Sequence, residues 1–129
     1  MREIKFRGLD LMDGSWVYGG IFKTKSGKVF IVNELTKEAH RVDGESVGQF
    51  TGIHDKYGTG IYEGDILKSP ASFDKVFWKE DSWGTEVMER HQEKGGWIVG
   101  YVGRGITINA KYAEVAGNIH DESNPLEDI

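Results

Sequence analysis

Short apolar runs separated by glycine make up most of this chain. Residues 3–7 alternate strictly, which places Ile4 and Phe6 on one face and three charged side chains on the other. This period of two predicts an edge or half-exposed strand. Residues 28–32 are apolar on both faces, as in a more central strand. Further strands are predicted at 16–18, 75–79, 97–102, 106–108 and 113–119.

The composition agrees with a mostly β protein. Glycine occupies 18 of the 129 positions and proline only 2. Because glycine weakens a helix interior by about 1 kcal/mol relative to alanine, few long helices are expected. Short β-branched and aromatic strands between turn residues indicate a small barrel or a sandwich. The last strand is expected to place four residues on one face, namely Ala113, Val115, Gly117 and Ile119.

One segment, 85–94, departs from the strand pattern. It is rich in helix formers and spaces Glu86 and Arg90 four residues apart, as in a helix-stabilising ion pair. Its apolar face is thin, and ten residues that bury so little make a marginal helix. A single short helix and a β-hairpin arm both fit this segment.

The centre of the chain, residues 49–67, contains two turn signals. Asp55 followed by Gly58 has the form of a tight turn, because aspartate can accept hydrogen bonds from the backbone ahead of it and glycine tolerates a positive φ. Residues 63–65 form a second turn that leads into another strand. Seven positions are expected to define the fold rather than an active site: Phe50, Gly52, Asp55, Gly58, Tyr62, Gly64 and Asp65.

Three blocks of sequence carry a resemblance to a known family. They are MREIKFR at 1–7, GQFTGIHDK at 48–56 with IYEGDI at 61–66, and EVAGNIHD at 114–121 with Asn124-Pro125. In this order they resemble the YopX family of small phage and prophage proteins. The resemblance implies a mostly β fold that contains an SH3-like barrel, and a bacterial or phage origin. It implies no mechanism, and residues 69–95 depart from the family pattern.

From these observations we expect one β domain over residues 1–121. Its barrel-forming part is placed at about 48–121, with additional N-terminal strands that complete or cover it. Residues 122–129 are expected to form an acidic tail. The charge supports this division, because the net charge of −5 comes from residues 114–129, which contain five acidic residues and no Lys or Arg.

Several classes of function are disfavoured by composition. Without cysteine there is no disulfide framework, thiolate zinc site or Cys nucleophile. No apolar run approaches the roughly 18 residues of a membrane helix, and the first residues do not resemble a signal peptide. We therefore expect a cytoplasmic protein of a bacterial host cell, with no membrane partner. No serine elbow or phosphate-binding loop is present, so no catalytic residue and no cofactor is predicted.

One cluster of possible metal ligands lies within the central segment: His54, Asp55, Glu63 and Asp65. Histidine and carboxylates suit zinc or manganese, so a metal-dependent hydrolase is one alternative function. The spacing matches no established ligand pattern, and Asp55 and Asp65 are better explained as turn-capping residues.

A second alternative is a small barrel that binds single-stranded nucleic acid. Lys75, Phe77, Trp78 and Lys79 interleave aromatic and basic side chains. Arg2, Lys5 and Arg7 are candidates to extend this strip. The acidic total charge opposes the interpretation, so nucleic acid is the less favoured partner.

The favoured function is a phage- or prophage-derived accessory protein that acts by binding and not by catalysis. Residues 29–32 and 97–102 are apolar on both faces, which exceeds what one small core needs. Open strand edges pair readily with another chain. We therefore expect self-association through strand edges, with an unidentified host or phage protein as another partner.

Overall fold

The computed structural model describes residues 4–69, 73–79, 82–90, 97–104, 113–120 and 123–125. Contacts along the chain divide it into two compact units, which we call unit 1 (Met1–Gly52) and unit 2 (Ile53–Ile129). Within the described ranges, no helix is long and apolar enough to cross a membrane.

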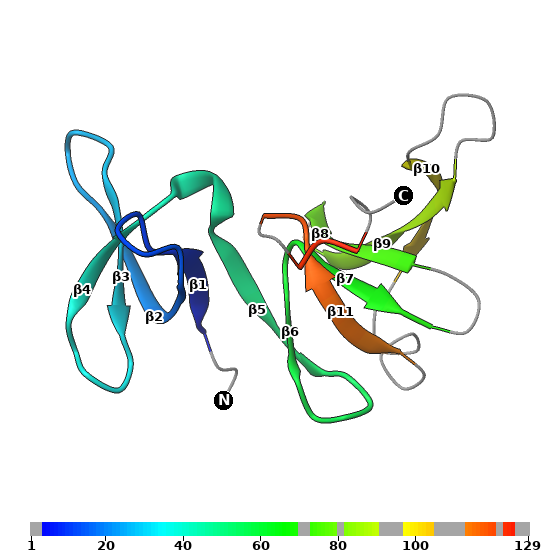
Figure 1. Cartoon of the computed structure of the whole chain (residues 1–129), viewed down its shortest axis with the longest axis horizontal. Coiled ribbons are helices and arrows are strands. Elements are labelled where there is room, and N and C mark those ends of the chain that lie inside the picture. Colours follow the sequence, from blue (N-terminus) through cyan, green and yellow to red (C-terminus); the bar gives the residue numbers. More distant parts are fainter. Residues whose placement is uncertain are drawn as a thin grey trace. The chain divides into compact units, whose positions relative to one another are not determined.

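The described residues form two antiparallel sheets (Figure 1). The strands are β1 (Phe6–Leu9), β2 (Trp16–Lys23), β3 (Val29–Asn33), β4 (Ala39–Val42), β5 (Gly48–His54), β6 (Gly60–Tyr62), β7 (Asp65–Lys68), β8 (Phe73–Lys79), β9 (Ser82–Arg90), β10 (Trp97–Arg104) and β11 (Glu114–Asn118). The first sheet has the order β4-β3-β2-β1-β5-β6 and the second β10-β9-β8-β7-β11. The prediction of a mostly β fold is therefore confirmed.

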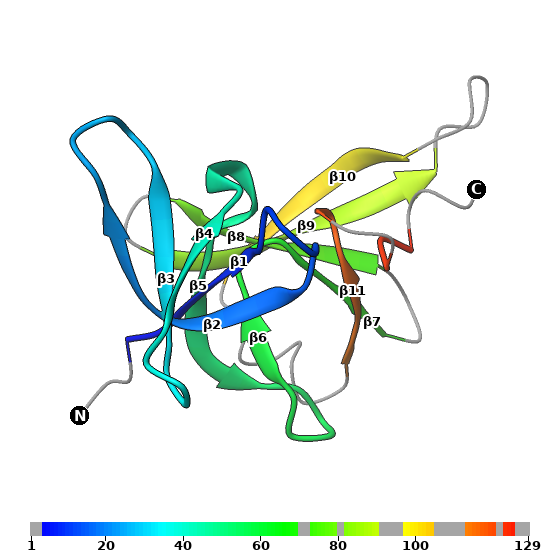
Figure 2. The same ribbon diagram turned by 60° about the vertical axis from the view of Figure 1, so that its left-hand side comes forward.

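Unit 1 is a run of antiparallel hairpins whose last strand returns beside the first. β2 and β3 form a long hairpin (Figure 2), and β5 pairs with β1. Asp10, just after β1, bridges Val42 at the end of β4. A 3-10 turn, η1 (Gly44–Ser46), precedes β5 and is capped by Asp43, whose carboxylate accepts the Glu45 N–H at 3.1 Å. These contacts bring the end of β4 back to the end of β1.

The core of unit 1 lies on one side of these strands. Val17, Ile31 and Val42 are almost fully buried, and Phe6, Val29 and Val47 pack against them. Because successive side chains of a strand point to opposite faces, the residues between these core positions face away from the core. This alternation gives β2 and β3 a second face, which is described below.

The N-terminal strand differs from its prediction. β1 begins at Phe6 and lies between β2 and β5, so it is not an edge strand. Ile4, on the apolar face of the predicted strand, is 71% exposed, whereas Arg7, on its charged face, is only 6% exposed. The guanidinium carbon of Arg7 lies 4.3 Å from the ring centroid of Trp16. An aromatic ring thus covers the charged side chain, which alternation within the strand does not reveal.

Unit 2 has its own core. Ile61, Leu67, Val76 and Ala113 are buried together. Ile53, Trp83 and Val115 pack against this cluster. The buried residues come from β6, β7, β8 and the residue before β11, so the core links segments that are far apart in the sequence.

The last strand also differs from its prediction. The segment 113–119 does form a strand, β11, which pairs with β7. The register shifts between Val115 and Gly117, which oppose the adjacent residues Leu67 and Ile66. Such a β-bulge turns the residues that follow it to the other face. Ala113, Val115, Gly117 and Ile119 therefore do not share one face.

The segment that fitted both a helix and a hairpin arm is a strand over its described part. β9 pairs with β8 on one side and β10 on the other, and these two ladders override its helix-forming composition. Residues 91–94 and the predicted strand at 106–108 lie outside the described residues. So do most of residues 122–129, where the acidic tail is predicted. The single domain over 1–121, with its barrel-forming part at about 48–121, stays a prediction.

Candidate functional site

The turn after β5 is held by one carboxylate. Asp55 Oδ1 accepts hydrogen bonds from the N–H groups of Tyr57 and Thr59, both at 2.9 Å. Its Oδ2 accepts the N–H of Val115, sixty residues away, at 2.8 Å. The Asp55 carbonyl accepts the Gly58 N–H at 3.0 Å, and Gly58 has a φ of +86°. The predicted tight turn is present, and its aspartate also joins the turn to β11.

These contacts set the protonation of Asp55. Burial by itself raises the pKa of a carboxyl group, but the backbone N–H groups of Val115, Thr59 and Tyr57 outweigh it and hold the pKa of Asp55 below its ordinary value of 3.8. Asp55 is therefore a carboxylate whose two oxygens are both engaged by backbone donors.

The second turn is built similarly. Asp65 is almost fully buried and accepts the N–H of Tyr62 through Oδ2 at 2.8 Å. Gly64 has a φ of +90°, and its N–H donates to the carbonyl of Val76 at 3.0 Å. The remaining positions expected to define the fold are placed as follows: Phe50 and Tyr62 are buried, and Gly52 has a φ of +82°.

The four candidate metal ligands lie on these same turns. The two aspartates use their oxygens for backbone N–H groups, while His54 is exposed and Glu63 is half-buried. In the ranges that the structure covers, no group of three or more His, Asp or Glu side chains is placed to hold a metal ion. The hydrogen bonds favour a structural role for Asp55 and Asp65.

Substituting Gly64 tests the second turn. Gly64→Val will lower the free energy of unfolding by about 2–4 kcal/mol, because valine is strained at positive φ and its Cβ will lie 3.2 Å from Nε2 of His120. The measurement is a urea unfolding midpoint. Gly58→Val is the control, since Gly58 has a similar φ but no neighbouring atom within 4 Å of a Cβ. If both variants lose the same free energy of unfolding, the contact with His120 contributes nothing. If the midpoint of Gly64→Val is unchanged, Gly64 does not occupy a positive-φ turn.

Among the candidate nucleic-acid residues of β8, Trp78 does not share a face with Lys75 and Phe77. Strand alternation puts Lys75 and Phe77 on one face, and Val76 and Trp78 on the other. Val76 belongs to the core, whereas Trp78 is 42% exposed and makes an edge contact with Trp83 at a centroid distance of 4.8 Å. Lys79 ends the strand opposite Ser82. Of the residues expected to extend the strip, Arg7 is buried, Lys5 pairs with Glu34 at 3.6 Å, and Arg2 lies outside the described residues.

A different aromatic surface, which the sequence did not suggest, lies on the outer face of unit 1. Phe22 of β2 and Phe30 of β3 are directly opposed in the ladder. Their rings stack with centroids 5.1 Å apart and an interplanar angle of 7°. Phe22 is 45% exposed and Tyr18, on the same face, is 37% exposed. We call Tyr18, Phe22 and Phe30 the aromatic face.

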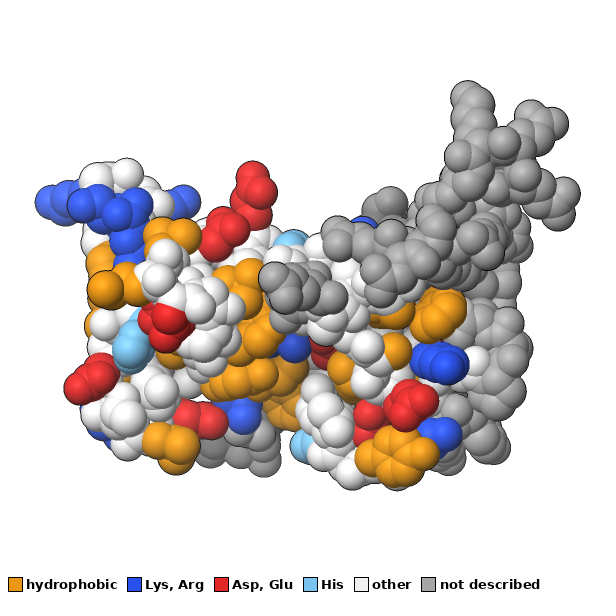
Figure 3. All heavy atoms as spheres, in the orientation of Figure 1, with side chains coloured by type: hydrophobic (Ala, Val, Ile, Leu, Met, Phe, Trp, Pro, Cys, Tyr) orange, Lys and Arg blue, Asp and Glu red, His pale blue; other side chains and the backbone are white. Residues whose placement is uncertain are grey.

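Basic residues adjoin the aromatic face. Lys23, Lys25 and Lys28 are all exposed at the tip of the β2–β3 hairpin, where Figure 3 shows basic side chains gathered beside hydrophobic ones. Arg41 of β4 is opposed to Phe30 and is also exposed. The available signal in the sequence was the stretch 14–33, which contains three lysines and no acidic residue.

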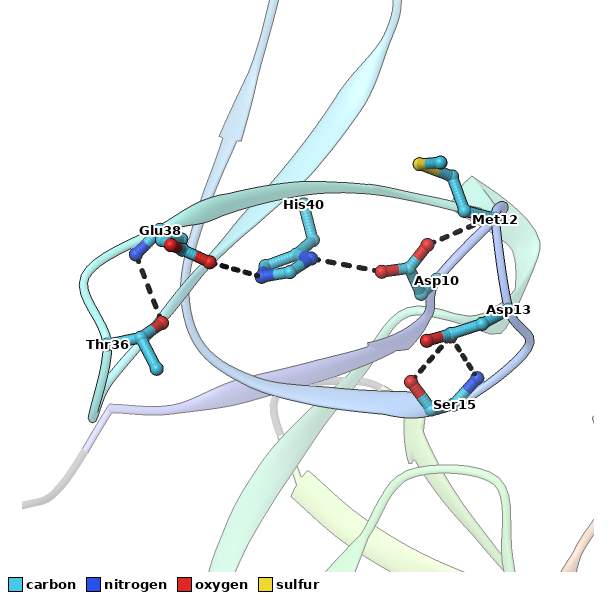
Figure 4. A network of polar contacts seen from close by, with 7 residues as sticks. All are labelled: Asp10, Met12, Asp13, Ser15, Thr36, Glu38 and His40. Carbon is cyan, nitrogen blue, oxygen red and sulfur yellow. Dashed lines mark hydrogen bonds and ion pairs between the residues drawn. The ribbon is translucent and has the colours of Figure 1, made fainter.

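A polar network on unit 1 is the other cluster of titratable groups (Figure 4). Nδ1 of His40 lies 3.0 Å from Oδ2 of Asp10, and its Nε2 lies 3.8 Å from Oε2 of Glu38. Asp10 Oδ1 also accepts the Met12 N–H at 2.7 Å. A histidine held by carboxylates can serve as a general base in nucleophilic catalysis only if a nucleophile lies beside it.

The nearby hydroxyl group does not complete such a site. Ser15 donates its hydroxyl to Asp13 Oδ1 at 2.6 Å, and its N–H donates to the same oxygen at 2.9 Å. The side-chain and backbone hydrogen bonds of Ser15 hold the pKa of Asp13 below its ordinary value. The network therefore ties the loop between β1 and β2 to β4.

Comparison of the sequence with known proteins assigns the chain to a family. A search of curated proteins found no significant match to the chain. The family model described as YopX protein matches residues 5–127. This range includes both units, the two central turns and the aromatic face. The chain therefore belongs to the YopX family.

Proposed function

We propose that this YopX family member is a small accessory protein of phage or prophage origin that acts in the bacterial cytoplasm by binding and not by catalysis. The observation that carries the proposal is the aromatic face. Tyr18 and Phe22 of β2 are 37% and 45% exposed, and Phe22 stacks on Phe30 of the paired strand β3. Exposed aromatic side chains of this kind mark an interaction site. The partner is a host or phage component or a second copy of the chain.

The chemistry of the titratable groups supports a non-catalytic role. Asp55 and Asp65 accept backbone N–H groups, and the Ser15 hydroxyl donates to Asp13 rather than to His40. These groups organise turns and loops. Phe22, by contrast, stacks on Phe30 and keeps 45% of its surface exposed, so binding is the activity that the geometry of unit 1 favours.

The sequence placed the SH3-like barrel implied by the family resemblance at about 48–121; we infer instead that it lies in unit 1. Strands β1 to β4 follow one another as antiparallel hairpins, a 3-10 turn precedes β5, and β5 returns beside β1. The Asp10 to Val42 bridge supports closure between the ends of β1 and β4. Such closure reduces the exposed edges of a small sheet.

The proposed function is tested by comparing two variants of the tagged full chain in induced cells. Phe22→Ala removes a ring of the aromatic face, and Leu35→Ala removes an equally apolar, exposed side chain from the β3–β4 turn. We expect the captured protein or nucleic acid, or the self-associated species seen by light scattering, to be retained by Leu35→Ala and lost by Phe22→Ala. Identical binding by the two variants will contradict the proposal.

A further inference from the structure

We propose that the aromatic face and the adjoining hairpin lysines bind single-stranded nucleic acid, an inference that rests on the proposed binding function and names its partner. The site consists of Tyr18, Phe22 and Phe30 with Lys25, Lys28 and Arg41. It lies on unit 1 and is distinct from the β8 residues that the sequence pattern suggested.

The charge at this hairpin selects an anionic partner. Residues 14–33 carry three lysines and no acid, although the chain as a whole has a net charge of −5. Among the residues that the structure describes, Lys5 and His40 lie in ion pairs with Asp or Glu, whereas Lys23, Lys25 and Lys28 lie in none. The ammonium groups of Lys25 and Lys28 are exposed and are placed to contact phosphates without breaking an existing pair.

The Phe22 and Phe30 rings favour a partner that has planar groups free to stack on them. Phe22 and Phe30 are nearly parallel, 7° apart, and Phe22 keeps 45% of its surface exposed. Nucleic-acid bases stack on such aromatic side chains when they are not paired within a duplex. An acidic peptide can pair with the lysines but offers no base to stack on the rings. Single-stranded nucleic acid can make both contacts and therefore fits this surface better.

Geometry places the two features within reach of one ligand. Phe30 lies two residues after Lys28, and Lys25 lies in the turn that joins β2 to β3. Lys23 follows Phe22 directly and therefore points to the other face of β2. Register opposes Phe30 to Arg41, so an exposed guanidinium group shares the face of the stacked rings. When a base of a short oligonucleotide stacks on Phe22, the neighbouring phosphates therefore lie close to the hairpin tip or to Arg41.

The test measures binding of a fluorescent 20-nucleotide poly-dT strand to the full chain by anisotropy. We expect binding at 50 mM salt that weakens by about 20-fold at 200 mM, as for three phosphate contacts. Phe22→Ala is expected to weaken it by about tenfold, whereas Phe22→Trp retains it. Lys28→Gln is expected to reduce the salt dependence, and Lys68→Gln, which removes one exposed lysine from unit 2, is the charge-matched control.

Several results overturn the inference. One is the absence of oligonucleotide binding at 50 mM salt, and another is an equal loss of affinity in the Lys68→Gln control. Tighter binding of a duplex of the same length also contradicts the inference. So does a loss of binding in Trp78→Ala when Phe22→Ala still binds. Thermal unfolding of each variant excludes misfolding as the cause of a loss. If the oligonucleotide does not bind but Phe22→Ala still abolishes capture of a protein partner, the nucleic-acid inference fails and the proposed binding function stands.

Discussion

Gly19→Ala will unfold unit 1 or lower its free energy of unfolding by more than about 3 kcal/mol. A Cβ at this position will lie 1.8 Å from the carbonyl oxygen of Val32 and 2.9 Å from its carbonyl carbon. These are backbone atoms of the neighbouring strand, next to Asn33, which is opposite Gly19 in the β2–β3 ladder, so no side-chain movement relieves the clash. The ladder itself must separate, and the stacked pair Phe22 and Phe30 lies only three residues further along it.

The adjacent glycine provides a matched control. Gly20 lies in the same strand, and a Cβ there meets no atom within 4 Å. Gly20→Ala is therefore expected to change stability by less than about 1 kcal/mol. The measurement is the urea midpoint followed by tryptophan fluorescence and by circular dichroism. Equal midpoints for the two variants will show that β2 and β3 do not approach as closely as described.

Asp55→Ala will destabilise unit 2 by about 1–3 kcal/mol. The substitution leaves three backbone N–H groups, those of Tyr57, Thr59 and Val115, without their acceptor, and a buried donor that loses its partner costs about 1–3 kcal/mol. Asp55→Asn keeps one oxygen and removes the charge, so its effect should be smaller. Urea unfolding at pH 7 measures both losses.

The same carboxylate gives stability a predictable dependence on pH. Because the pKa of Asp55 is lowered in the folded chain from 3.8, its stabilising contribution is complete above that ordinary value and is lost as pH falls through the folded pKa. Stability of the wild type should therefore decline at acid pH more steeply than that of Asp55→Asn. Parallel pH profiles for the two proteins will contradict the assignment.

Asp13→Ala is the control for the Asp55 substitutions. The pKa of Asp13 is also lowered, first by the Ser15 hydroxyl and then by its N–H, but Asp13 is exposed and its partner is two residues away. Its removal opens a local loop contact and joins no distant strands. If Asp13→Ala lowers the free energy of unfolding as much as Asp55→Ala does, the long-range hydrogen bond from Val115 to Asp55 contributes nothing to stability.

The candidate site was only partly predictable from sequence. The turn at Asp55 and Gly58 was predicted because its bonds join residues two to four positions apart, and local chemistry specifies such contacts. The aromatic face was not predicted. Its two phenylalanines are eight residues apart in the sequence, and only the register of β2 with β3 opposes them. The exposed rings also contradict the usual expectation that aromatic residues are buried.

The amino-acid sequence by itself determined that this chain is mostly β, that it turns at Asp55–Gly58 and at Gly64, and that it resembles the YopX family. Strand alternation and turn chemistry act over a few residues, so they can be read locally. The tertiary structure decided that Arg7 is covered by Trp16 and that the β11 bulge reverses the facing of Gly117. It also decided that Asp55 bonds Val115. Each of these depends on a partner from another strand, because burial and register are properties of packed pairs and not of one segment.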